Sequence, residues 1–123
     1  MTRLSDGAFE EFERIVMFKI LEEENETNAL LRVQYESAKI IKREFTGAGF
    51  FTHFSIPKTI RRAPAGTEYG YGDVVASFDG SDFCYGFVLF IKEGLISSLE
   101  GYTCTDSWPE NIQTYELKHA WEV

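Results

Sequence analysis

The sequence predicts an α+β domain in which two N-terminal helices pack on one face of a mostly antiparallel sheet of about five to six strands. Apolar residues first recur every three to four positions, as in helices, and later alternate with polar residues, as in strands. The later segments are separated by turns too short for the crossovers that parallel strands require. The length of 123 residues fits a single domain, residues 1–123.

The two helices are expected at residues 5–24 and 28–38. In the first, spacings of three and four place on one face the apolar residues Phe9, Phe12, Val16 and Ile20. The run Glu22-Glu23-Glu24 puts like charges at the unfavourable end of the helix dipole and predicts that the helix stops there. Thr27 or Asn28 is the expected N-cap of the second helix.

Strand character returns in segments at residues 41–46, 50–56, 72–78, 83–91, 95–102 and about 113–119. Gly47-Ala48-Gly49 separates the first two segments and predicts a hairpin, and residues 57–71 are expected to form the longest loop. The segment 83–91 is apolar on both faces, which indicates a central strand. Since the helices cover one face, we expect the other to be covered by the long loop, by curvature of the sheet or by a second subunit.

The charge balance limits the classes of partner. The chain carries 12 Lys and Arg against 20 Asp and Glu, a net charge of −8, with an isoelectric point near 4.7. This charge argues against nucleic acid and against an anionic membrane surface as partners. It favours encounters with basic partners. The longest nearly apolar stretch, residues 83–91, is too short for a membrane-spanning helix, which needs about 20 residues.

Cys84 and Cys104 are too few for a disulfide scaffold. The expected hairpin brings them within about two residues of each other, so a disulfide would require a bulge that shifts the pairing. No apolar signal-peptide segment follows the first residues, and we therefore expect a cytoplasmic protein. In that reducing compartment both cysteines are expected to be small buried hydrophobes with free thiols.

No catalytic, cofactor-binding or metal-binding constellation stands out. The Gly47-Ala48-Gly49 turn lacks the third glycine and the following helix of a dinucleotide fingerprint, and no phosphate-binding GxxxxGK[ST] motif occurs. The soft metal ligands are not spaced as zinc-binding pairs; they are His53, Cys84, Cys104 and His119. We therefore expect no metal and no cofactor, and a binding protein is favoured over an enzyme.

Several aromatic and acidic residues near loops and strand ends are candidates for contact with a partner. The predicted partner-binding residues are Tyr69, Tyr71, Glu100, Tyr102, Asp106 and Trp108. Aromatic residues on loops are typical of binding hot spots, and equally of lids over small cores. Glu44 and Glu100 lie inside strands, where an acid either acts as a general acid or base or is solvated or paired with a cross-strand cation.

Three segments carry a resemblance to known proteins: Thr46–Thr52, Gly94–Tyr102 and the pair Trp108-Pro109. They fall within residues 43–110, which resemble small bacterial proteins of unknown function and a segment of several immunity-type proteins. Proteins of that type are small and acidic, are encoded next to secreted toxins, and bind and block those toxins. The resemblance implies that Glu100, Tyr102 and Trp108 lie on an exposed, partner-facing end of the sheet. It carries no catalytic residue onto this chain.

The leading hypothesis is a non-enzymatic cytoplasmic protein-binding domain, immunity-like, that masks a basic partner through an acidic and aromatic surface. One alternative is a small-ligand-binding domain or hydrolase, with a pocket on the sheet that holds Glu44, His53 or Glu100. A second alternative is a structural homodimer joined through the open face of the sheet.

Overall fold

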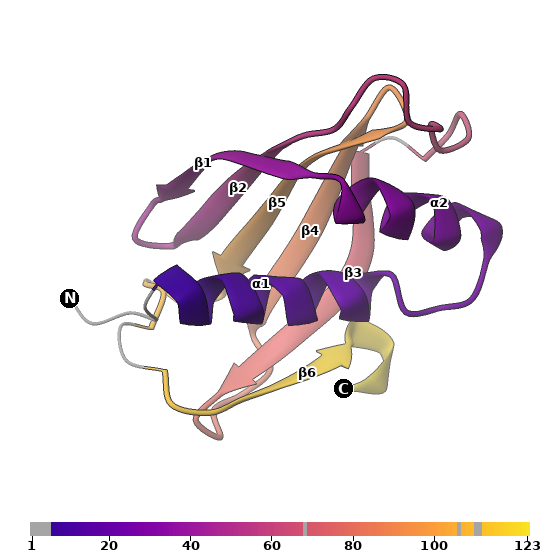
Figure 1. Cartoon of the computed structure of the whole chain (residues 1–123). Coiled ribbons are helices and arrows are strands. Elements are labelled where there is room, and N and C mark those ends of the chain that lie inside the picture. The colour runs from indigo at the N-terminus through magenta and orange to yellow at the C-terminus, as the bar shows by residue number, and fades with distance from the viewer. Residues whose placement is uncertain (1–5, 68, 106, 110–111) are drawn as a thin grey trace.

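The computed structural model describes residues 6–67, 69–105, 107–109 and 112–123. The helices are α1 (Asp6–Ile20), α2 (Glu26–Glu36) and the short 3-10 helix η1 (Ala120–Glu122). The strands are β1 (Lys39–Phe45), β2 (Gly49–Ser55), β3 (Tyr69–Phe78), β4 (Tyr85–Lys92), β5 (Leu95–Thr103) and β6 (Tyr115–His119). Figure 1 shows two N-terminal helices followed by a sheet, so the predicted α+β class is confirmed.

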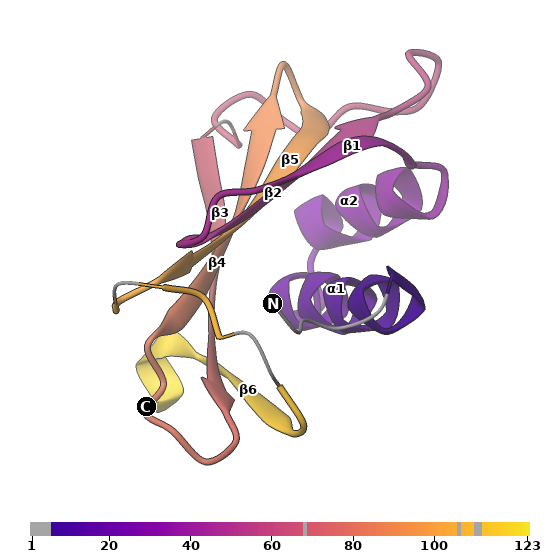
Figure 2. The ribbon, with the colours of Figure 1, turned by 90° about the vertical axis from the view of Figure 1, so that its left-hand side faces the viewer.

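The described strands form one sheet with the order β1-β2-β5-β4-β3-β6. Every pair of neighbours is antiparallel, as the short turns predicted. The strand predicted to be central, β4, lies between β5 and β3. In Figure 2, α1 and α2 lie on the same side of the sheet, and we call the face that neither of them covers the helix-free face. Neither of these two helices is long and apolar enough to cross a membrane.

The ends of the helices differ from the sequence-based prediction. Helix α1 stops at Ile20, so the acidic run that follows it belongs to the connection and not to the last turn. Helix α2 begins at Glu26 because the extended residue Asn25 is its N-cap and accepts a hydrogen bond from the amide of Asn28 at 2.7 Å. The prediction of Thr27 or Asn28 as the cap is therefore wrong. Asn28 lies in the first turn of α2, and its side chain is buried.

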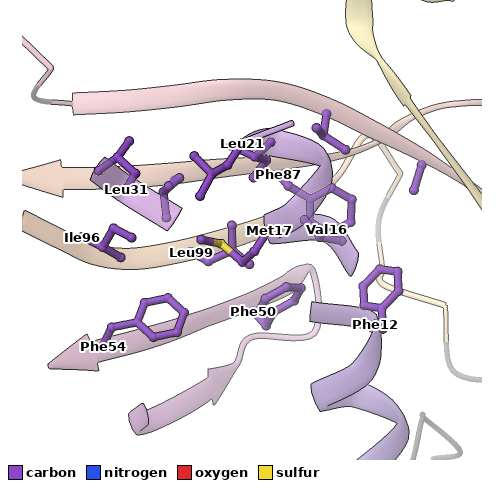
Figure 3. Packing of buried hydrophobic residues seen from close by; sticks show 14 of the residues in the cluster. Phe12, Val16, Met17, Leu21, Leu31, Phe50, Phe54, Phe87, Ile96 and Leu99 are labelled. Atoms are coloured by element: carbon purple, nitrogen blue, oxygen red, sulfur yellow. The ribbon is translucent and has the colours of Figure 1, made fainter. Parts of the chain in front are cut away.

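The hydrophobic core lies between the two helices and the sheet. Its largest fully buried apolar side chains are Phe12, Val16, Met17, Leu21, Leu31, Phe50, Val74, Phe87, Leu89 and Leu99. Figure 3 shows side chains of α1 and α2 meeting those of β2, β4 and β5. Burying one such side chain stabilises the fold by about 1.5–3 kcal/mol relative to leaving it in water. The predicted stripe on α1 is confirmed, because Phe9, Phe12, Val16 and Ile20 are all buried.

Cys84 and Cys104 form a disulfide, with their Cα atoms 5.3 Å apart. The expectation of two free thiols is therefore wrong. A bulge is the reason: the pairing of β4 with β5 shifts between Phe90 and Ile91, and this shift moves Cys104 opposite Cys84. The amide of Cys104 also donates a 3.0 Å hydrogen bond to the carbonyl of Cys84. Because disulfides persist mainly in oxidising compartments, the disulfide disagrees with the expected cytoplasmic location, which stays a prediction.

Candidate interaction site

The residues predicted to bind a partner do not form one surface. Tyr71 faces the helices and donates a hydrogen bond to Oδ1 of Asn28. Glu100 and Tyr102 lie on the opposite face of the sheet, as the next paragraphs describe. Asp106 and the side chain of Tyr69 lie outside the described residues.

Trp108 is a core residue, only 7% exposed. Its indole makes edge-to-face contacts with Phe50 and Phe87, at centroid distances of 5.5 and 6.1 Å. Its amide donates a 2.7 Å hydrogen bond to the carbonyl of Gly47, which ties the segment after β5 to the β1–β2 turn. The ring therefore closes one end of the core and does not lie on the exposed end of the sheet that the resemblance implies.

The helix-free face of the sheet holds Glu100 and Tyr102. Tyr102 is 44% exposed, and its ring lies against the backbone of the cross-strand Gly86, where a Cβ would overlap the ring. Glu100 stands between Phe51 of β2 and Val88 of β4. These side chains make the surface here mixed polar and apolar.

Two of the three residues expected in a pocket on the sheet do meet on this face. Nε2 of His53 lies 2.7 Å from Oε1 of Glu44, and both side chains are partly exposed to solvent. Phe51 separates Glu44 from Glu100, because it is the register partner of both. With strands about 4.8 Å apart, the two acids are about 10 Å from each other, so the three side chains do not converge.

A different group of acidic and aromatic side chains surrounds a hollow of about 690 Å³ at the C-terminal end of α1. We call it the acidic hollow. Its lining includes four carboxylates of the described residues, those of Glu22, Glu23, Asp73 and Glu122. Further polar and aromatic side chains of the wall are those of Asn28, Tyr71, His119 and Trp121. Trp121 is 76% exposed.

Local backbone features bring these residues together. The connection after α1 supplies Glu22 and Glu23, and η1 supplies Trp121 and Glu122. Strand β3 supplies Asp73 through an irregularity in its pairing with β4 between Tyr71 and Val74. Gly72 in this irregularity has a φ of 92°, and a Cβ there would lie 2.6 Å from Cγ2 of Ile20, so glycine is required.

His119 is held between two carboxylates from different elements. Its Nε2 lies 2.5 Å from Oε2 of Glu22, and its Nδ1 lies 3.0 Å from Oδ1 of Asp73. Burial lowers the pKa of His119, but the hydrogen bonds and charges of Glu22 and Asp73 outweigh burial and raise it above the ordinary 6.5. The hydrogen bond from His119 in turn lowers the pKa of Glu22 below 4.5 against the opposing effect of burial, and Lys19 adds to this lowering.

Lys19 and Trp121 extend the network around His119. Nζ of Lys19 lies 3.1 Å from Oε2 of Glu22 and 3.8 Å from Oε1 of Glu122. The indole of Trp121 stacks on the imidazole of His119 with centroids 5.4 Å apart and planes 3° apart. With Lys19 and a protonated His119 counted against the four carboxylates, the net charge is −2, and it becomes −3 when His119 loses its proton.

This arrangement suits an organic cation better than a metal ion. In the part of the chain that the structure describes, no group of three or more His, Cys, Asp or Glu side chains is arranged to hold a metal. Carboxylates beside an exposed indole can bind a guanidinium or ammonium group through charged hydrogen bonds and cation–π contact.

Sequence reasoning named Tyr71, which lines this hollow, as a partner-binding residue, but missed the acidic and aromatic residues around it. It interpreted Glu22 and Glu23 as a helix stop, considered His119 only as a metal ligand, and did not single out Trp121. The available signal was weak: a tryptophan between a histidine and a glutamate near residue 120. Comparison of the chain with protein-family models, with curated proteins and with solved structures finds no significant match. Function is therefore inferred from the residues and their geometry.

Proposed function

We propose that the chain is a non-enzymatic protein-binding domain that binds a basic segment of a partner protein at the acidic hollow. In this proposal it masks the partner in the manner of immunity-type proteins. The observation that carries the proposal is the gathering of four carboxylates and a 76% exposed indole around one hollow. An exposed tryptophan beside acidic groups is a typical anchor for arginine at an interface.

Arginine is the side chain that suits this surface best. Its planar guanidinium can bind two carboxylate oxygens at once and can stack on an aromatic ring. The cation–π contact with an exposed ring contributes about 0.5–1 kcal/mol. The net charge of −8 adds long-range attraction, which accelerates association with a basic protein and weakens as salt is added.

The state of His119 does not suit a general base. A general base must be neutral to accept a proton, whereas Glu22 and Asp73 raise the pKa of His119 and favour the imidazolium. Both ring nitrogens are also engaged by carboxylates, which leaves neither nitrogen directed at a substrate.

A defined probe tests the proposal. The probe is a short peptide of arginine residues with blocked termini, and its neutral counterpart contains citrulline at the same positions. Calorimetric titration at low salt should detect the arginine peptide and not the citrulline peptide. Added salt should weaken the binding.

Two variants test the location of the binding surface. Trp121→Ala and Glu23→Gln should each weaken binding by about 2–5-fold, because each removes one exposed contact. Glu100→Gln on the helix-free face is the matched control and should leave the affinity unchanged. Equal weakening by Glu100→Gln, or no effect of Trp121→Ala and Glu23→Gln, would contradict the acidic hollow as the binding surface.

The immunity-like part of the proposal has its own test. It predicts that the gene lies beside a gene for a secreted toxin with a basic surface, and that this toxin competes with the arginine peptide. A gene neighbourhood that encodes no toxin and no secretion component would contradict this part and leave the peptide-binding test unaffected.

A further inference from the structure

The carboxylates of the acidic hollow are already occupied by cations of the same chain. Glu22 binds both His119 and Lys19, Asp73 binds His119, and Glu122 lies 3.8 Å from Lys19. A basic partner would need these same carboxylates. We propose that His119 and Lys19 are internal placeholders for the basic groups of the partner, and that partner binding displaces His119 from its carboxylates with release of its proton to solvent. This inference rests on the proposed function.

Hydrogen-bond chemistry makes the placeholder depend on pH. Each ring nitrogen of His119 faces a carboxylate oxygen, at 2.5 Å for Glu22 and 3.0 Å for Asp73. Only the imidazolium can donate from both nitrogens, since the neutral ring has a single N–H. Loss of the proton therefore replaces one of the two hydrogen bonds with a lone pair facing a carboxylate, and the contact with that carboxylate becomes unfavourable.

The charged groups facing His119 come from every element around it. The end of α1 and its connection supply Lys19, Glu22 and Glu23, β3 supplies Asp73, and η1 supplies Glu122. Three of the four carboxylates are paired with an internal cation, and each of those pairs is at least partly exposed to solvent. The carboxylate of each pair is partly exposed, so an incoming guanidinium can reach it and exchange for the internal cation.

His119 also fixes the short helix η1. Its backbone amide donates a 2.8 Å hydrogen bond to Oε1 of Glu122, and its ring carries the stacked indole of Trp121. Displacement of the ring from Glu22 and Asp73 therefore changes the position of Trp121 relative to the hollow. The same indole is the anchor for arginine in the proposed function. Partner binding and displacement of His119 therefore both act on Trp121.

Linkage fixes the direction of the effect. If the partner binds better when His119 is neutral, then protonation must weaken partner binding by the same factor by which the partner weakens proton binding. We expect the affinity for the arginine peptide to increase about tenfold as pH rises through the titration of His119, which lies within the usual range of coupling. The side chains of the partner keep their charge throughout this range.

The experiment measures peptide affinity from about pH 5.5 to about pH 8.5 for the wild type and two variants. His119→Gln removes the titrating group, and its affinity should be independent of pH and close to the high-pH value of the wild type. His53→Gln is the matched control, because His53 also bonds a carboxylate, Glu44, but on the helix-free face. It should keep the wild-type pH dependence.

Proton resonances of the His119 imidazole provide the second readout. In the free protein, His119 should titrate above 6.5, and saturating peptide should move its titration to lower pH. Peptide binding that does not vary with pH, or that leaves the titration of His119 unchanged, would overturn the placeholder and leave the proposed function standing. Absence of peptide binding at every pH and in every variant would overturn both.

Discussion

Reduction of the Cys84–Cys104 disulfide should lower the free energy of unfolding by about 3 kcal/mol. The two cysteines are 20 residues apart in sequence. Loop closure on that scale costs the unfolded chain about 11 cal/mol/K of entropy, from 2.1 + 1.5R ln 20, which is about 3.3 kcal/mol at 298 K. Removing the cross-link returns this entropy to the unfolded state and destabilises the fold by that amount.

Urea unfolding with and without a thiol reductant, followed by the near-ultraviolet signal of the buried Trp108, measures the change. The double variant Cys84→Ala/Cys104→Ala should unfold at the lower urea concentration and should not respond to the reductant. Two results would refute the reasoning: free thiols detected in the purified, unreduced protein, or identical unfolding midpoints before and after verified reduction of both cysteines.

The remaining predictions use the same unfolding assay. Trp108→Ala should cost about 3–5 kcal/mol because it empties the end of the core, whereas Trp121→Ala on the surface should change stability by less than about 0.5 kcal/mol; similar costs would contradict the assigned burial. Glu13→Gln should cost about 3–5 kcal/mol, since the 1% exposed carboxylate has Arg43 at 3.0 Å as its partner, and an unchanged midpoint would be inconsistent with a buried ion pair. The stability that His119 contributes should be full below pH 6.5 and lost as pH rises through its raised pKa. The contribution of Glu22 should be full above pH 4.5 and lost as pH falls through its lowered pKa. Wild type and His119→Gln should therefore differ most in melting temperature between pH 4.5 and pH 6.5. A constant difference across pH would contradict the pairing of His119 with Glu22 and Asp73.

Local sequence determined the type and order of the elements and the buried face of α1. The three-to-four spacing on α1 predicted which side chains face the core, since helix geometry places such residues on one face. Alternation and short turns predicted antiparallel strands, and two apolar faces predicted that β4 is central. Each of these inferences depends on residues close together in the chain, and local steric and hydrophobic constraints act at that range.

The strand order, the disulfide and the acidic hollow were decided only by the tertiary structure. The disulfide required a one-residue bulge in the pairing of β4 with β5, which no residue type in those strands specified. His119 bonds Glu22, which lies 97 positions away in the chain, and Asp73, which lies 46 positions away. Such contacts depend on the register and twist of a whole sheet, and a change of one residue in register would turn Asp73 away from His119. The pattern of apolar residues therefore predicted the core face of α1, while the relative placement of distant charges came from the way the strands are paired.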